Sequence, residues 1–318
     1  MKRHAIVAIL GLTAWVMGSA LGALGPVQAH AQSAGIAVGK AHASFTPSLT
    51  GSKPIVVLAV GSGARPGDDV LHSLADSIHL VFIDPTSHHA TLVGIPRDSY
   101  VPIPGQGTGK INSSLFYGGP DLLVQTVESI SGVQIDYWAI TTFWGFTDMI
   151  NQIGGLTVDV PFRFYDPTYS RADLQPGVQT LDGQQALAFA RDRHSMLEGD
   201  FARQENGGRL FLAALAQFQK TYAQDAATLV TWLGAGMSNT FTAIPLSEVE
   251  QLAFTSSKIP VKQVQNVVLP GSAQMAGSLS VVILSNDWKT RIFNDVKADA
   301  VLSKKNVPPS PTADQPKN

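Results

Sequence analysis

Continuous runs of apolar residues recur along this chain and end at glycine, proline or polar residues. Residues 55–60 read Ile-Val-Val-Leu-Ala-Val, a second run covers residues 78–83, and a third covers residues 91–95. Runs of this length without polar alternation are typical of strands that are buried on both faces of a sheet. The connection between the second and third runs is short and polar, which predicts a hairpin. The sheet is therefore expected to be mixed rather than purely parallel.

Segments with apolar residues at helical spacing lie between such runs. In residues 119–131, Leu122, Leu123, Val127 and Ile130 fall on one side of a helix. The same patterns predict further helices at 143–153 and 286–298, and further strands at 137–141, 157–160, 264–269 and 279–283. Strands that alternate with helices predict an α/β fold, here a single α/β/α sandwich with a mixed central sheet over residues 54–300.

The two ends of the chain differ from this domain. Lys2 and Arg3 precede an apolar run from Ala5 to about Val27, and Ala29-His30-Ala31 has the small-x-small form of a signal-peptidase site. We expect residues 1–31 to be a cleaved signal peptide or a retained transmembrane anchor. Either outcome places the remainder outside the cytoplasm, on the cell membrane or secreted. Composition predicts that residues 32–53 are a linker and that the proline-rich residues 301–318 are a disordered tail.

Composition excludes several classes of function. The net charge is −2, which argues against nucleic acid as a partner. The chain has no cysteine, so disulfides, thiolate zinc sites and cysteine nucleophiles are excluded. It also lacks the H-E-x-x-H and G-x-S-x-G motifs of metalloproteases and serine hydrolases.

The stretch from Leu181 to Leu215 concentrates charge in a chain that is only 14% charged. Asp182 is placed to cap a short helix, and Asp200 to cap a longer one. Arg191 and Arg193 then fall on the connection between the two helices and can point the same way if it is extended. Paired guanidinium groups suit phosphate oxygens. The alternative is a surface ion-pair cluster around these arginines, which would contribute little.

Other charged groups fall at strand ends, where ligands of α/β sheets usually bind. Asp76 precedes the second strand, and Arg97 and Asp98 follow the third. Arginines together with a carboxylate-bound metal ion can hold a pyrophosphate and stabilise phosphoryl transfer. The charged groups available for this chemistry are Arg65, Asp76, Arg97, Asp98, Lys110, Arg191, Arg193, Asp200 and Arg203.

From about Pro54 to Leu215 the chain resembles the LytR-CpsA-Psr family of cell-wall glycopolymer ligases. The resemblance rests on several motifs in the same order. They are Ala75-Asp76-Ser77, Gly94-Ile95-Pro96-Arg97-Asp98-Ser99-Tyr100-Val101, Lys110-Ile111-Asn112, Tyr117-Gly118-Gly119-Pro120, the segment 154–161, the segment 181–191, and Asp200-Phe201-Ala202-Arg203-Gln204.

This resemblance implies a membrane-anchored extracytoplasmic phosphotransferase. Such enzymes move an anionic glycopolymer, such as teichoic acid or a capsule-like polymer, from undecaprenyl pyrophosphate to peptidoglycan. The lipid lies in an apolar tunnel, and Mg²⁺, with Mn²⁺ as the alternative, bridges the pyrophosphate. Carried onto this sequence, the metal ligand is Asp76, and the residues implied to bind pyrophosphate are Arg97, Arg191, Arg193, Arg203 and Arg65. Lys110 is a further candidate substrate ligand, and Asp98 is expected to support Arg97 or assist the attacking hydroxyl.

Three positions depart from the family pattern. Gly63 stands where the family usually has an aspartate near the metal, and Leu74 where it commonly has arginine. Gly207 stands where it usually has glutamine. Asp68 or Asp69 is the candidate replacement for the missing carboxylate. Two alternatives stay open: a polyprenyl-pyrophosphate pyrophosphatase, and a lipid-pyrophosphate-binding wall-assembly protein with weakened catalysis.

Overall fold

The computed structural model describes residues 35–42, 53–237 and 240–314. Its central sheet has seven strands among these residues, in the order β12-β1-β7-β2-β3-β4-β13. The strands are β1 (Ile36–Lys40), β2 (Ile55–Ser62), β3 (Ala75–Asp84), β4 (His89–Gly94), β7 (Tyr137–Thr142), β12 (Thr240–Thr242) and β13 (Val264–Val268). Antiparallel and parallel pairs both occur in it, so the predicted mixed sheet is confirmed.

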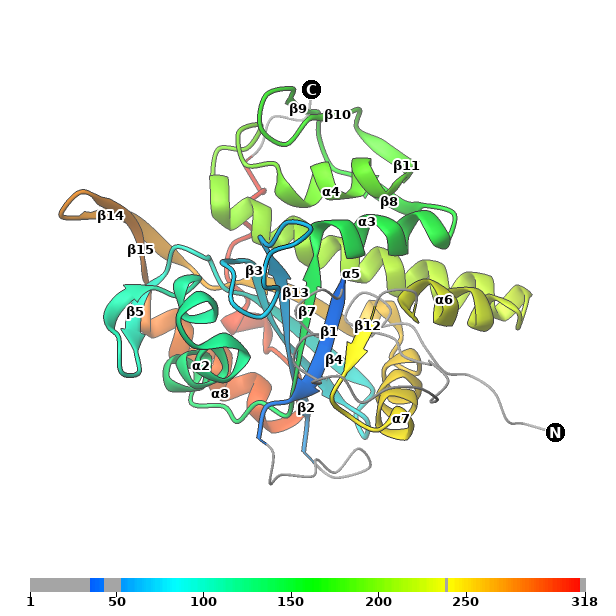
Figure 1. The fold of residues 1–318 in the computed structure, drawn as a ribbon, viewed down its shortest axis with the longest axis horizontal. Helices are drawn as coiled ribbons and strands as arrows, with labels where there is room; N and C mark the ends of the chain where they lie inside the picture. Colours follow the sequence, from blue (N-terminus) through cyan, green and yellow to red (C-terminus); the bar gives the residue numbers. More distant parts are fainter. Residues whose placement is uncertain (1–34, 43–52, 238–239, 315–318) are drawn as a thin grey trace.

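Helices cover both faces of this sheet (Figure 1). One face packs against α3 (Phe143–Gln152), α4 (Gly183–Arg191), α5 (Gly199–Gln224), α6 (Thr228–Met237) and α7 (Leu246–Ser257). The other face packs against α2 (Ser113–Ser131) and α8 (Asn286–Asp299). Successive residues of β2 enter the two cores in turn, Val57 and Ala59 on one side and Val56 and Leu58 on the other. This explains why the strand sequences are continuously apolar, and it confirms the α/β/α sandwich.

Eight further strands form two-stranded hairpins or ladders beside the sheet. They are β5 (Tyr100–Ile103) with β6 (Gly107–Lys110), β8 (Leu156–Val160) with β11 (Gly177–Leu181), β9 (Phe164–Asp166) with β10 (Ala172–Leu174), and β14 (Gly271–Ala276) with β15 (Leu279–Leu284). The predicted strands at 157–160 and 279–283 therefore exist but lie outside the central sheet. Figure 1 shows the β14–β15 hairpin extending away from the body of the molecule.

Two segments that composition assigned to a linker and a tail are structured in part. Residues 36–40, inside the predicted linker, form β1 between β7 and β12. Ile36 to Gly39 are buried, but the run is short and lies in a segment rich in alanine, serine, glycine and threonine, so composition gave no strand signal. At the other end, the carboxylate of Glu205 accepts hydrogen bonds from Ser310 and from the main chain and hydroxyl of Thr312. Residues 302–306, which include a short 3₁₀ helix at Lys304–Asn306, bond instead to Gln265 of β13 and Asp295 of α8, so residues 301–314 pack onto the domain rather than forming a free tail.

The predicted signal or anchor segment, residues 1–31, lies outside the described residues. Within the described ranges, no helix combines the length and apolar character needed to cross a bilayer.

Arg191 ends α4, Arg193 lies in the connection to α5, and Arg203 lies in α5. Asp182 caps α4 as predicted, because its carboxylate accepts the main-chain N–H of Gln185 at 2.8 Å and Gln185 returns the contact. Asp200 is not the cap of α5; it lies within the first turn, and Glu198 occupies the cap position. A carboxylate in the first turn still complements the positive end of the helix.

A histidine in the middle of β3 ties this strand to α5. His79 is 1% exposed, and its Nε2–H donates to the main-chain carbonyl of Gln204 at 2.9 Å. Its Nδ1 lies 3.2 Å from the hydroxyl of Ser77. Burial lowers the pKa of His79 to about 4 from an ordinary 6.5; the Gln204 bond opposes this shift, and the charge of Arg203 adds to it. His79 is therefore neutral at pH 7, and it helps to hold α5 over the sheet beside Arg203.

This burial predicts a specific pH dependence of stability. Below pH 6.5 the unfolded chain binds a proton at His79 that the folded chain excludes until about pH 4. The free energy of unfolding should therefore fall as pH drops from 6.5 to 4, by up to about 3 kcal/mol from this residue. Urea unfolding of wild type and His79→Leu at several pH values measures it, and the variant should lose this part of the slope.

The exposed turn residue His88 supplies the control. It adopts a positive φ of 56°, which asparagine tolerates, so His88→Asn should keep the wild-type slope. An unchanged slope in His79→Leu would contradict the assignment.

Candidate active site

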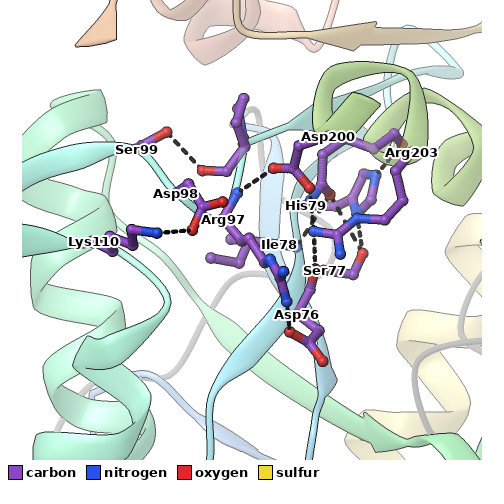
Figure 2. A network of polar contacts seen from close by, with 12 residues as sticks. Asp76, Ser77, Ile78, His79, Arg97, Asp98, Ser99, Lys110, Asp200 and Arg203 are labelled. Atoms are coloured by element: carbon purple, nitrogen blue, oxygen red, sulfur yellow. Dashed lines mark hydrogen bonds and ion pairs between the residues drawn. The ribbon is translucent and has the colours of Figure 1, made fainter. Parts of the chain in front are cut away.

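The antiparallel pairing of β2, β3 and β4 brings distant charged residues to one edge of the sheet. Asp76 lies near the start of β3, and Arg97 follows the end of β4. Because β3 runs opposite to both neighbours, the start of β3 and the ends of β2 and β4 meet at this edge. The first turn of α5 adds Asp200 and Arg203. The sequence thus places four charged groups from three segments side by side (Figure 2).

Hydrogen bonds and ion pairs connect these four groups. The Arg97 guanidinium pairs with the Asp76 carboxylate, and Arg203 pairs with Asp200. The main-chain N–H of Arg97 donates to Asp200 at 3.0 Å, and Arg203 Nη2 donates to the Asp76 carbonyl at 2.7 Å. These contacts link all four residues, so the guanidinium groups of Arg97 and Arg203 have little freedom to move.

Burial shapes the charges of this network. Burial opposes the charge on Arg97, but Asp76, with Asp200 and Asp98 further away, raises its pKa above the ordinary value. Burial raises the pKa of Asp200, although the positive charge of Arg203 opposes this shift. Burial likewise lowers the pKa of Arg203, although the negative charge of Asp200 opposes it. The Nε atoms of both arginines are buried without an acceptor among the described residues. The cluster therefore retains N–H donors that an oxyanion could satisfy.

A cavity of about 270 Å³ opens beside this network. One part of its wall is charged and the other is apolar. The charged part includes Asp76, Arg97, Arg191, Arg193 and Arg203, and the polar His194 lies beside them. The apolar part, contributed by the sheet and by α3, α4 and α5, includes Ala59, Ala139, Phe143, Phe146, Leu187, Leu210 and Phe211. Such a wall suits a ligand with an anionic head and an apolar tail.

Arg191 and Arg193 line the cavity together, as the alternation of the sequence suggested. The Arg191 guanidinium lies 4.6 Å from the ring centroid of Phe143, a cation–π contact with the first residue of α3. Asp192, between them, is fully buried and accepts hydrogen bonds from the main-chain N–H groups of His194 and Ser195. Among the described residues, no ion pair joins Asp192 to either arginine, so a surface ion-pair cluster does not form.

Other predicted site residues lie outside the cavity wall. Asp98 pairs with Lys110 at 2.9 Å, and neither lines the cavity. Arg65 is exposed, and its main-chain N–H donates to the carboxylate of Asp68. Asp69 contacts His72 at 2.9 Å. Asp76 is therefore the carboxylate of the described cavity wall, while Asp68 and Asp69 bind within their own loop.

The three positions that depart from the family pattern have different surroundings. A Cβ at Gly63 would lie 2.8 Å from Oδ2 of Asp76, so a side chain there would meet the Asp76 carboxylate directly. A Cβ at Gly207 would lie 2.8 Å from Cε1 of His79, so the histidine ring occupies the space of a longer side chain. Leu74 is 45% exposed and does not line the cavity.

Asp166, Asp192 and His194 form a second polar group, next to the cavity. Two carboxylate oxygens and one imidazole nitrogen lie within 4.8 Å of one another, near enough to hold a metal ion. The same carboxylates already accept hydrogen bonds from nearby main-chain groups. Asp166 and His194 escaped prediction because the hairpin that carries Asp166 has no motif and lies far from His194 in the sequence.

The wall also contains residues that the sequence did not single out. His79 had one signal, since it is a lone polar residue within an otherwise apolar strand. Tyr169 and Ser170, on the β9–β10 hairpin, had none. The apolar wall residues lie in the predicted strands and helices, and periodicity alone does not distinguish core from the lining of a cavity.

Comparison with known proteins relates this site to a family. The model of the LytR_cpsA_psr family matches residues 27–298. The chain is 36% identical over 159 residues to the polyisoprenyl-teichoic acid–peptidoglycan teichoic acid transferase TagU of Bacillus subtilis, a match that covers 50% of each protein. TagU of Enterococcus faecalis is 27% identical over 254 residues, 79% of this chain and 81% of TagU.

The crystal structure of B. subtilis TagV superposes with a TM-score of 0.65 at 27% identity, over 77% of this chain and 98% of TagV. The chain spans about half the length of several curated relatives, including the B. subtilis TagU and TagV proteins. Since the family model covers most of the chain and the fold agrees, the chain belongs to the LytR_cpsA_psr family.

Proposed function

We propose that this protein is a phosphotransferase that moves an anionic glycopolymer from undecaprenyl pyrophosphate to peptidoglycan, outside the cytoplasm. The observation that carries the proposal is the convergence of four arginines, Arg97, Arg191, Arg193 and Arg203, on a cavity whose other wall is apolar. A lipid-linked pyrophosphate has the matching form, with a strongly anionic head and a hydrocarbon tail. The names of the B. subtilis and E. faecalis relatives support teichoic acid as the polymer class.

The proposed reaction is a substitution at phosphorus. A peptidoglycan hydroxyl oxygen forms a bond to the phosphorus that carries the glycan, and the bond from that phosphorus to the bridging oxygen breaks. Polyprenyl phosphate leaves with the electron pair of that bond, and the hydroxyl proton passes to solvent or to a nearby base. The arginines stabilise the charge that develops on the bridging and non-bridging oxygens.

Within this proposal each charged group has a separate task. Arg191, at the end of α4, and Arg193, in the connection to α5, contact the pyrophosphate together with Arg97 and Arg203. Asp200 holds Arg203 and the main chain of Arg97 in place. Asp98 acts indirectly: it raises the pKa of Arg97 through space while it pairs with Lys110. Arg65 and Lys110 lie outside the cavity wall, so in this proposal they bind the part of the substrate that extends beyond the cavity.

The donor set fits a magnesium or manganese ion only in part. Mg²⁺ is commonly held by one or two carboxylates together with substrate phosphate oxygens. Asp76 offers one carboxylate, which Arg97 shares, and Asp68 and Asp69 are bound within their own loop. We propose that Asp76 holds the ion together with the pyrophosphate. Once bound, the ion would neutralise phosphate charge.

The direct test is a transfer assay with purified protein, Mg²⁺, a lipid-linked glycan and a peptidoglycan acceptor. Transfer of the polymer with release of polyprenyl phosphate is expected. Release of phosphate products without peptidoglycan would instead identify a pyrophosphatase. Tight binding of the lipid with no turnover under Mg²⁺ or Mn²⁺ would identify a binding protein, and either outcome would overturn the proposal.

Removal of either arginine of the α4–α5 connection should reduce turnover. Arg191→Ala and Arg193→Ala should each lower kcat by about a hundredfold, since a donor to the transition state is lost. Arg291→Ala is the matched control, because Arg291 lies on α8, on the opposite face of the sheet, and pairs with Asp287 at the surface. Steady-state kinetics measure the effect; wild-type kcat in both variants would contradict their proposed role.

Restoring a carboxylate at position 63 should strengthen metal binding. In Gly63→Asp the new side chain would meet Asp76, so the two carboxylates repel until a cation joins them. We expect the thermal midpoint of the variant to be below that of wild type in EDTA. It should rise with Mg²⁺, and the Mg²⁺ concentration for half-maximal turnover should fall about tenfold.

Gly63→Asn, with nearly the same shape and no charge, separates charge from crowding. It should not gain this magnesium response. Equal responses of the Asp and Asn variants would show that position 63 does not face the metal.

A further inference from the structure

An exposed tyrosine lies at the rim of the cavity. Tyr169 is 66% exposed although it contributes to the cavity wall. Its ring stacks on that of His194, with the centroids 4.2 Å apart and the planes 29° from parallel. His194 therefore covers part of the tyrosine ring, and the large exposed fraction shows that much of the remainder is open to solvent.

A buried carboxylate holds this tyrosine in place. Asp166, 4% exposed, accepts the main-chain N–H groups of Tyr169 and Ser170, each at 3.0 Å, and contacts Nδ1 of His194 at 3.1 Å. Burial alone would raise the pKa of Asp166, but these hydrogen bonds hold it well below its ordinary value. Burying a charge is costly unless it is fully hydrogen-bonded. Here the buried Asp166 carboxylate orders the turn between β9 and β10, although the Tyr169 side chain on that turn points outward and adds little to the core.

A second set of bonds fixes the hairpin relative to the arginines. The buried Asp192, between Arg191 and Arg193, accepts the Ser195 hydroxyl at 2.6 Å. The same hydroxyl oxygen accepts the main-chain N–H of Tyr165, in β9, at 2.9 Å. Hydrogen bonds therefore join the hairpin that carries Tyr169 to the segment that carries the two arginines, and stacking on His194 orients the Tyr169 ring.

We propose that Tyr169, supported by His194, is the platform for the first saccharide ring of the glycan on the pyrophosphate. This inference rests on the proposed function. A sugar bonded directly to the phosphate lies within one sugar length of the arginine contacts, so it must pass the rim of the cavity. Sugars have an apolar C–H face that packs on an aromatic ring and hydroxyls that stay in water, which fits a tyrosine that stacks on His194 and is otherwise largely exposed. The lipid is a poorer fit here, since the neighbours of Tyr169 are the polar Ser170 and His194.

Two lipids that differ only in the sugar test this inference. The probes are geranylgeranyl pyrophosphate and the same lipid with one N-acetylglucosamine on its pyrophosphate, each titrated calorimetrically into the full chain with Mg²⁺. Tyr169→Ala should weaken binding of the glycosylated lipid about fivefold to tenfold, and binding of the bare lipid less than about twofold. Tyr169→Phe, which keeps the ring, should restore affinity for the glycosylated lipid to within about twofold of wild type.

Tyr165→Ala is the matched control. Tyr165 lies on the same hairpin and is 59% exposed, but it packs under the Arg163 guanidinium and does not line the cavity. It should leave both affinities unchanged. Equal weakening of both lipids by Tyr169→Ala, or no weakening of either, would overturn the saccharide platform while the proposed function stands. Failure of the wild-type protein to bind either lipid would overturn the proposed function itself.

Discussion

The ion pair between Asp200 and Arg203, buried at the start of α5, is the contact on which the site depends. Charges removed from water are costly, and losing one partner leaves the other uncompensated. This pair is compensated because it is continuous with Asp76 and Arg97 through main-chain and side-chain hydrogen bonds. The first turn of α5 must therefore lie against the start of β3. Once it does, Arg191, Arg193 and the apolar side of α5 are placed around the same cavity.

The sheet makes this arrangement possible through its direction changes. The hairpin from β3 to β4 brings Arg97 back to the edge where β3 began, so residues about twenty positions apart become neighbours. His79 and Gly207 also lie where β3 meets α5. The His79 ring, on β3, occupies the space that a side chain at position 207, on α5, would need. A glutamine at position 207 would therefore require a smaller residue at position 79, so the departure at Gly207 is physically linked to the presence of His79.

The sequence predicted the elements whose signal is local. The runs at 55–60 and 78–83, the capped helix after Asp182 and the hairpin between 84 and 90 all formed where continuous apolar residues and turn chemistry indicated. The prediction failed for segments whose structure depends on contacts with distant parts of the chain. Strand β1 is short and lies in a segment rich in small residues, and it exists because β7 and β12 offer hydrogen bonds on both sides. Residues 310–312 of the predicted tail are held in place because Glu205, buried on α5, needs donors that Ser310 and Thr312 supply.

The same division holds for the site. Arg97, Arg191, Arg193 and Arg203 were predicted because guanidinium groups at strand ends and helix connections favour phosphate chemistry, and all four line the cavity. Lys110 and Arg65 carried the same signal but lie outside the cavity wall. Charge patterns alone cannot distinguish arginines and lysines that line a cavity from those that do not.

A crystal structure of the protein with geranylgeranyl pyrophosphate tests the central claim most directly. The account predicts the pyrophosphate oxygens within hydrogen-bond distance of Arg97, Arg191 and Arg203, with the hydrocarbon beside Phe146, Leu187 and Phe211. A pyrophosphate bound away from these arginines, or a lipid on the outer surface, would contradict it.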